Sequence, residues 1–206
     1  MFYTLQGEGA QSGRAAVFCR FSGCNLWSGK EEDRGKAVCQ FCDTDFTGTD
    51  GPGGGKFQTP ADLAATVRDK FPVTASQQVR PLIVCTGGEP LLQMDQDLVA
   101  AFHDLGLEVA VETNGTFLPP AGLDWICVSP KAGTELKLRS GDELKLVFPQ
   151  EGIEPEGFES LDFRYFFLQP KGGSEVKKNT QLAVRYCLAH PRWRLSLQMH
   201  KLIGIP

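Results

Sequence analysis

The feature that most constrains the fold is a series of short apolar segments, each followed by a polar segment that contains glycine or proline. In the first of them Val17, Cys19 and Phe21 share one face and Phe18 and Arg20 the other, which is the alternation of a β-strand. The predicted strands are 15–21, 81–85, 107–111, 125–128, 143–148, 164–168 and 193–198, and the predicted helices are 59–70, 93–105 and 175–190. Apolar strands that alternate with helices indicate an α/β fold with a parallel sheet, curved or closed into an incomplete, TIM-like barrel.

The polar segments follow the strands at their carboxyl ends, and these ends meet at one edge of a parallel sheet. The pattern therefore predicts one ligand site at this edge. Four segments mark it, namely 86–90, 112–115, 129–131 and 169–172.

Length and composition narrow the class of protein. The chain has 206 residues and a formal net charge of -4, which suits a single domain over 1–206, with an inserted loop at about 25–38. No basic stripe indicates a nucleic-acid surface, and no apolar run approaches the roughly 20 residues of a membrane span. Because no secretory signal is apparent either, a cytoplasmic location is expected.

Seven cysteines are an odd number, which does not suit a fully paired set of disulfides. Cys85, Cys127 and Cys187 stand alone in apolar runs and are interpreted as core residues. The other four crowd one segment, as expected of a metal site in a reducing compartment. They are Cys19, Cys24, Cys39 and Cys42.

Two metal sites suit this group of cysteines. Fourteen residues separate Cys24 from Cys39 and two separate Cys39 from Cys42, so three thiolates can hold a four-iron cluster that keeps one iron open. Counting Cys19 as well gives the four ligands of a structural zinc site. The strand pattern favours the first, because it places Cys19 on an apolar face. Unligated thiols are the remaining alternative.

Several of these segments resemble those of the radical S-adenosylmethionine (SAM) enzymes. Residues 23–26 and 39–44 are similar to their cluster loop, including Phe41 before the last cysteine, although the usual spacing is C-x3-C-x2-C. Residues 86–90 resemble the GGEP segment that holds the amino end of SAM. With 5–9, 112–115, 129–131 and 198–201, nearly the whole chain resembles the 7-carboxy-7-deazaguanine synthase family, in its form with a C-x14-C-x2-C motif; residues 133–160 carry no motif.

The resemblance implies a [4Fe–4S] cluster on Cys24, Cys39 and Cys42, with SAM on its open iron. The paired glycines of the GGEP segment would let the backbone approach SAM without a side chain in the way. No catalytic side chain is implied beyond the cluster and SAM. The residues implied to contact SAM are Phe41, Cys42, Asp43, Gly88, Glu89, Glu112, Ser129, Pro130, Lys131, Gln169, Pro170, Lys171 and Gly172.

The same resemblance implies a lyase that converts 6-carboxy-5,6,7,8-tetrahydropterin to 7-carboxy-7-deazaguanine with loss of ammonia, a step of queuosine biosynthesis for tRNA modification. Glu8 would accept from the amide and amino edge of the pterin, Arg20 would pair with its carboxylate, and Thr44 would help to bind Mg²⁺. The substrate-binding residues implied are Leu5, Gln6, Gly7, Glu8, Arg20, Thr86, His200 and Pro206.

Further expectations concern partners and alternatives. The family implies a homodimer and an electron donor such as flavodoxin. It also carries another strand-forming stretch ahead of 2–6, where this chain has only Met1, so a truncated or misassigned start is expected. A glycyl-radical-activating enzyme would share the cluster but act on a protein. A zinc-binding module without catalysis is the alternative from another class.

Overall fold

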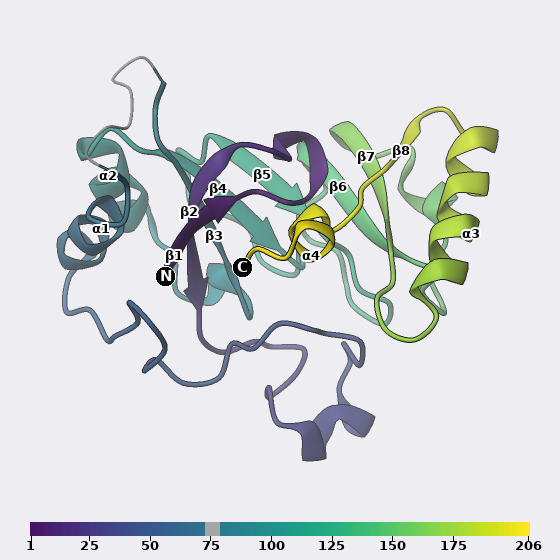
Figure 1. Cartoon of the computed structure of the whole chain (residues 1–206), viewed down its shortest axis with the longest axis horizontal. Helices are drawn as coiled ribbons and strands as arrows, with labels where there is room; N and C mark the ends of the chain where they lie inside the picture. The colour runs from purple at the N-terminus through teal and green to yellow at the C-terminus, as the bar shows by residue number, and fades with distance from the viewer. Residues whose placement is uncertain (73–78) are drawn as a thin grey trace.

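The computed structural model describes residues 1–72 and 79–206 and contains one eight-stranded sheet (Figure 1). The strands follow the chain order from β1 to β8, which form the two edges of an open sheet. Only the β1–β2 pair is antiparallel. The strands are β1 Phe2–Leu5, β2 Ala15–Phe21, β3 Leu82–Gly87, β4 Glu108–Thr113, β5 Trp125–Val128, β6 Ser140–Phe148, β7 Asp162–Pro170 and β8 Trp193–Leu195. The prediction of a parallel α/β sheet that stays incomplete as a barrel is confirmed.

Most predicted elements are present with shifted ends. β7 is longer than predicted and β8 is shorter, while β1 was not predicted at all. The short strand β1 is stabilised by its pairing with β2. This pairing is a tertiary contact, and the sequence of a four-residue segment does not predict it. The inserted loop contains the 3-10 helix η2, Glu31–Lys36.

The helices begin where side chains can cap them. Thr59 and Asp62 form a capping box at the start of α1, Pro60–Arg68, as the sequence indicated. Helix α2 spans Gln96–Asp104 and begins later than predicted, because Asp95 accepts from the backbone N–H of Leu98. The remaining helices are η1 Gly9–Gln11, η3 Pro90–Leu92, η4 Pro155–Phe158, α3 Val176–Ala189 and the unpredicted α4 Met199–Ile203.

Two apolar cores fix the outer face of the sheet. Helices α1 and α2 cover β2 to β4 at one end of the molecule, and α3 covers β6 and β7 at the other (Figure 1). Cys19 and Cys85 belong to the first core, as predicted, and Cys187 packs against the second. Cys127 is buried, but it points to the inner face and lines the cavity described below, so it is not a plain core residue.

The inner face of the sheet changes character along the strands. Near their amino ends Ala16, Leu82, Val84 and Ala110 form a small apolar cluster. Beyond that cluster the carboxyl ends carry polar side chains, and the long loop after β2 passes below them in Figure 1. Within the described residues, no helix is long and apolar enough to cross a membrane.

Candidate active site

A cavity of about 670 Å³ opens at the carboxyl ends of the strands. This volume lies within the range of sites for cofactors and small ligands. Its walls come from the loops after β2, β3, β4, β5 and β7 and from the carboxyl-terminal segment 196–206. A cavity therefore lies at the edge of the sheet where the sequence predicts a ligand site.

The three predicted cluster ligands, Cys24, Cys39 and Cys42, line this cavity as free thiols. A hydrogen bond from Cys39 is the main reason that the pKa of Cys42 is lowered to about 6, and the same bond raises the pKa of Cys39. A thiol that ionises readily suits a metal ligand, because the thiolate is the binding form. Cys19, by contrast, is 4% exposed in the core and does not reach the cavity.

The spacing of the thiols bears on the kind of metal site. In the described part of the chain, no three His, Cys, Asp or Glu side chains converge closely enough to hold one ion. A structural zinc ion needs such convergence. A four-iron cluster does not, because its thiolates bind separate irons. The donor set therefore fits the cluster better than zinc.

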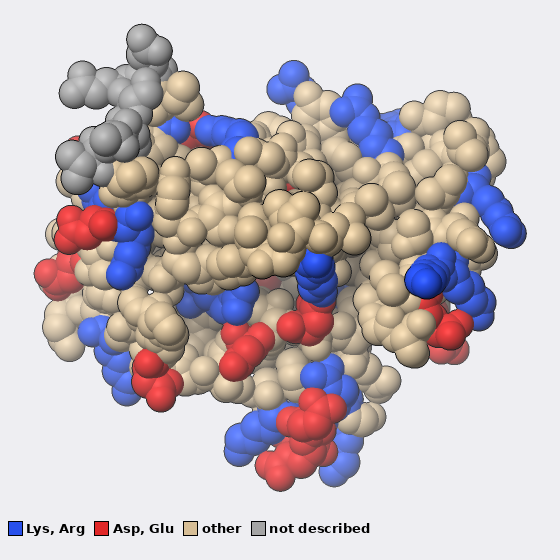
Figure 2. Space-filling model, in the orientation of Figure 1, with Lys and Arg blue, Asp and Glu red and all other residues tan. Residues whose placement is uncertain are grey.

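The inserted loop is held by one arginine. Arg34 lies over the ring of Trp27, at 4.1 Å from its centroid, and donates to the carbonyl oxygens of Gln40 at 2.9 Å and Cys42 at 3.0 Å. The Trp27 ring packs edge-on against Phe46. Arg34 thus ties the middle of the insert to the turn that carries the last two cysteines. The projecting insert carries acidic and basic side chains together (Figure 2).

The first cysteine is positioned by a close backbone approach. The N–H of Gly88 donates to the carbonyl of Phe21 at 3.0 Å, and that of Glu89 to the carbonyl of Gly23 at 2.9 Å. A Cβ on Gly88 would lie 1.9 Å from the oxygen of Gly23 and 3.2 Å from the Cβ of Cys24. The glycine is therefore required for this contact with the cluster loop, in addition to any approach of SAM.

The side chain of Glu89 has a different place from the one predicted. It is fully buried and accepts from the hydroxyl of Thr113 and the N–H of Asn114, both at 2.8 Å, and from the N–H of Leu91 at 3.0 Å. Burial raises the pKa of Glu89, although these bonds oppose the rise. Its carboxylate does not line the cavity, so it orients the turn after β4 instead.

The turn after β4 also contacts the cluster loop. The amide of Asn114 donates to Asn25 at 3.0 Å, and the amide of Asn25 donates to the hydroxyl of Thr116 at 3.0 Å. Asn25 directly follows the cysteine at position 24. A chain of hydrogen bonds therefore runs from the GGEP segment through the turn after β4 to Asn25, the residue that follows the first predicted cluster ligand.

A network of charged and amide side chains also lines the cavity. Lys145 on β6 forms ion pairs with Glu8 and, at 3.4 Å, with Glu112. The second oxygen of Glu8 accepts from Gln169 at 3.2 Å and from Gln198 at 2.9 Å. Burial opposes the charge of Glu8, but the ammonium and the hydrogen bonds hold its pKa below the ordinary value.

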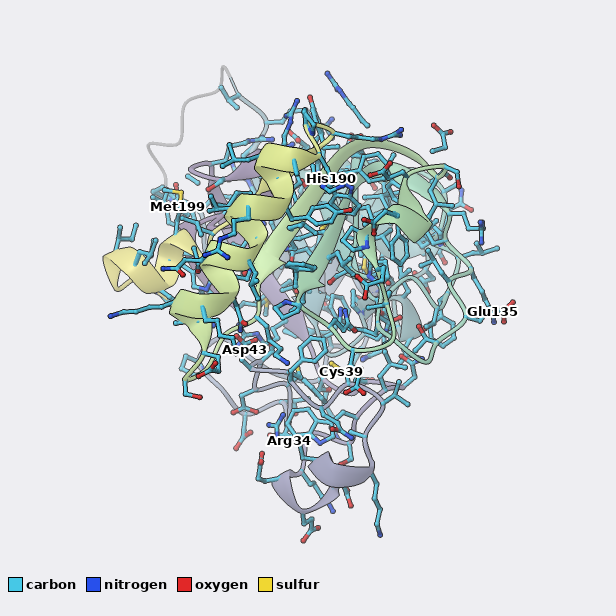
Figure 3. All side chains as sticks on the ribbon, turned by 90° about the vertical axis from the view of Figure 1, so that its right-hand side faces the viewer. Arg34, Cys39, Asp43, Glu135, His190 and Met199 are labelled. Carbon is cyan, nitrogen blue, oxygen red and sulfur yellow. The ribbon has the colours of Figure 1, made fainter. Side chains whose placement is uncertain are left out.

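The carboxyl-terminal segment crosses this wall. The N–H of Met199 donates to the carbonyl of Gly7 at 3.0 Å, and a Cβ on Gly7 would lie 2.3 Å from a ring nitrogen of His200. Lys201 pairs with Asp43 of the cluster loop. In Figure 3 Asp43 lies on the side of Cys39 that faces α4. The carboxyl-terminal segment therefore joins residues 5–9 to the cluster loop.

The end of the chain also reaches the cavity. The hydroxyl of Thr4 donates to a terminal oxygen of Pro206 at 3.1 Å. Arg20, predicted to meet a carboxylate, is exposed at the cavity wall and donates to the carbonyl of Asp45 at 3.3 Å. Lys131 donates to the carbonyl and hydroxyl oxygens of Ser129, and burial lowers the pKa of this lysine.

The structure gathers nearly all of the predicted site residues around one cavity. Gly7, Glu89 and Pro130 are not among the lining residues, and the roles of Gly7 and Glu89 are those given above. Lys145 is the main residue that the prediction missed. The sequence did contain a sign of its position, because Glu143 and Lys145 alternate with Leu144 and Leu146 and therefore lie on the opposite face of the strand. The predicted residues that do line the cavity are Leu5, Gln6, Glu8, Arg20, Cys24, Cys39, Phe41, Cys42, Asp43, Thr44, Thr86, Gly88, Glu112, Ser129, Lys131, Gln169, Pro170, Lys171, Gly172, His200 and Pro206.

An open parallel sheet with a three-cysteine loop over the cavity at its carboxyl edge defines a radical SAM enzyme. The chain is 63% identical over 206 residues to the 7-carboxy-7-deazaguanine synthase of Caulobacter vibrioides and 59% identical over 209 residues to that of Nitratidesulfovibrio vulgaris. Each alignment covers 100% of this chain and 97% of the relative. The chain belongs to the 7-carboxy-7-deazaguanine synthase family.

A solved structure agrees with this assignment. The crystal structure of QueE from Escherichia coli superposes with a TM-score of 0.68 at 27% identity, over 97% of this chain and 92% of that one. The radical SAM fold predicted from the sequence is thereby confirmed. A scan against family models gives no match. Membership in the family sets aside the glycyl-radical-activating enzyme and the zinc-binding module.

Proposed function

We propose that this protein converts 6-carboxy-5,6,7,8-tetrahydropterin to 7-carboxy-7-deazaguanine with release of ammonia, as a step of 7-deazapurine and queuosine biosynthesis. The observation that carries the proposal is that the three-cysteine loop, Gln6 and Glu8 line one and the same cavity. The relatives named for this product cover the whole chain.

The cofactors assigned to the cavity are a [4Fe–4S] cluster on Cys24, Cys39 and Cys42 and one SAM. When bound, they supply reductive cleavage of the sulfonium and removal of a hydrogen atom from the substrate. The chain itself contributes position and exclusion of water. Support for this assignment comes from the lining of the cavity, which combines the three thiols, the loops after β3, β5 and β7, and the carboxylate network around Glu8.

We assign the polar groups of the cavity to the two ligands by chemistry. Glu8, held ionised by its neighbours, accepts an N–H group of the pterin. Arg20 offers a planar guanidinium to the substrate carboxylate, and the Pro206 carboxylate faces the pterin edge. SAM takes the wall formed by Lys131 and Gln169 with the residues beside them.

Three finer assignments complete the proposal. Mg²⁺ binds beside Thr44 and is held mainly through the substrate carboxylate and water, because one hydroxyl is a weak site for this ion. A flavodoxin-type protein donates the electron, and the enzyme works as a cytoplasmic homodimer of single-domain chains. Magnesium dependence of turnover, with little magnesium bound in the absence of the pterin, is the expected result.

The central experiment is an anaerobic assay of the reconstituted protein with SAM, reductant and the carboxylated tetrahydropterin, with the deazapurine acid identified by mass spectrometry. The Cys24→Ala variant is expected to lose product and deoxyadenosine. Cys19→Ala is the matched control and keeps both, because Cys19 lies in the core. Equal loss in the two variants would overturn the choice of ligands, and a wild-type protein that forms no deazapurine would refute the function.

A further inference from the structure

Strand β6 places a lysine on the inner wall of the cavity. Leu144 and Leu146 are fully buried in the core beneath α3, so the intervening Lys145 points to the opposite face. Lys145 is only 4% exposed. An ammonium group in such a place is costly unless it is paired, and its partners therefore decide what it can do.

The bonds of this lysine leave room for a ligand. Its ammonium has three donors, of which two meet Glu8 and Glu112. A carboxylate has about four acceptor positions, and Glu8 uses three, for Lys145, Gln169 and Gln198. Among the described residues, each member of the Lys145–Glu8 pair thus keeps one hydrogen-bonding position beyond these contacts. Both side chains line the cavity.

Both groups are charged at neutral pH. Burial works against the ammonium, but the carboxylates of Glu112 and Glu8 raise the pKa of Lys145 well above its ordinary value. The pKa of Glu8 is lowered by the same contact. The pair therefore presents a strong donor next to a strong acceptor.

A lactam has the complementary pattern, because its ring N–H stands next to its carbonyl oxygen. We propose that Lys145 and Glu8 together recognise the lactam edge of the substrate, with Glu8 accepting from the ring N–H and Lys145 donating to the ring carbonyl. The inference rests on the proposed function, since the pterin carries this lactam. Lys145 is then a residue that determines the specificity of the enzyme for a lactam.

The test compares two stable pteridines on the holoenzyme with cluster and SAM. The first is 6-carboxypterin, which has the lactam. The second is 2,4-diaminopteridine-6-carboxylate, in which an amino group replaces the carbonyl and the ring N–H is lost. Fluorescence titration is expected to show that the wild type binds the first at least about tenfold more tightly, as one charge-assisted hydrogen bond allows.

Replacement of the lysine should weaken this preference. In Lys145→Gln the affinity for 6-carboxypterin is expected to fall about 10- to 100-fold, and the preference over the diamino ligand is expected to shrink to the part that Glu8 supplies through the ring N–H. Lys145→Arg, which keeps a charged donor, is expected to retain the preference. Lys178→Gln is the control for loss of one positive charge, because this side chain is 72% exposed on α3.

The outcomes separate the two proposals. A wild type that binds both pteridines equally overturns the recognition of the lactam, even if a Lys145 variant fails to fold. Retention of the wild-type preference by a folded Lys145→Gln protein does the same. A wild type with the preference but without deazapurine product supports the recognition and refutes the proposed reaction.

Discussion

Replacement of Gly88 by alanine tests whether the GGEP segment positions the cluster loop. The new Cβ would lie 1.9 Å from the carbonyl oxygen of Gly23 and 2.5 Å from its carbonyl carbon. An ordinary contact needs about 3.5 Å, so these atoms must separate by roughly 1.5 Å. The atoms that would have to move belong to backbone rather than to a flexible side chain.

The cost of Gly88→Ala follows from these contacts. Overpacking costs about 1–3 kcal/mol, and the two backbone hydrogen bonds between 21–23 and 88–89 contribute about 1 kcal/mol each. We therefore expect a loss of about 3–5 kcal/mol of unfolding free energy. For a chain of this size the loss corresponds to a Tm lower by about 6–20 °C.

Two measurements check this prediction, namely the Tm of the protein without cluster and the iron bound after anaerobic reconstitution. A displacement above 1 Å exceeds the roughly 0.5 Å within which site residues must be held, so iron content is expected to fall below half of the wild-type value. Gly157→Ala is the matched control, because no other atom lies within 4 Å of its added Cβ. If Gly88→Ala matches this control in both measurements, the steric argument is wrong.

Two further predictions concern the insert and the buried carboxylates. Arg34→Met removes the hydrogen bonds to two loop carbonyl oxygens and is expected to speed amide hydrogen exchange across 31–42 about 5- to 30-fold. Lys36→Met is the control. Equal exchange rates in the two variants would contradict the prediction. Burial raises the pKa of Glu143, so its proton binds more tightly in the folded state and stability is lost as pH rises from 4.5 through the folded pKa. Glu143→Gln, which stays neutral at every pH, is therefore expected to become more stable relative to the wild type in urea denaturation as pH rises above 4.5, and a difference that stays constant with pH would refute it.

The sequence alone determined most of the local elements and the position of the site. Alternation assigned Cys19 to the core face of β2, and Thr59 marked the start of α1. Strand periodicity and helix caps are local, so residues two to four positions apart decide them. The site followed from a general rule, because parallel strands bring their carboxyl-end loops together wherever the individual side chains point.

Only the tertiary structure decided which polar groups meet. Lys145 and Glu8 are 137 residues apart, and Met199 pairs with Gly7 across the cavity wall. The place of the Glu89 carboxylate was decided in the same way, because Thr113 and Asn114 at the end of β4 donate to it. The pattern of a strand shows which side chains share a face. The partners on that face depend on how distant segments pack, and a buried charge keeps its place only when that packing supplies the opposite charge.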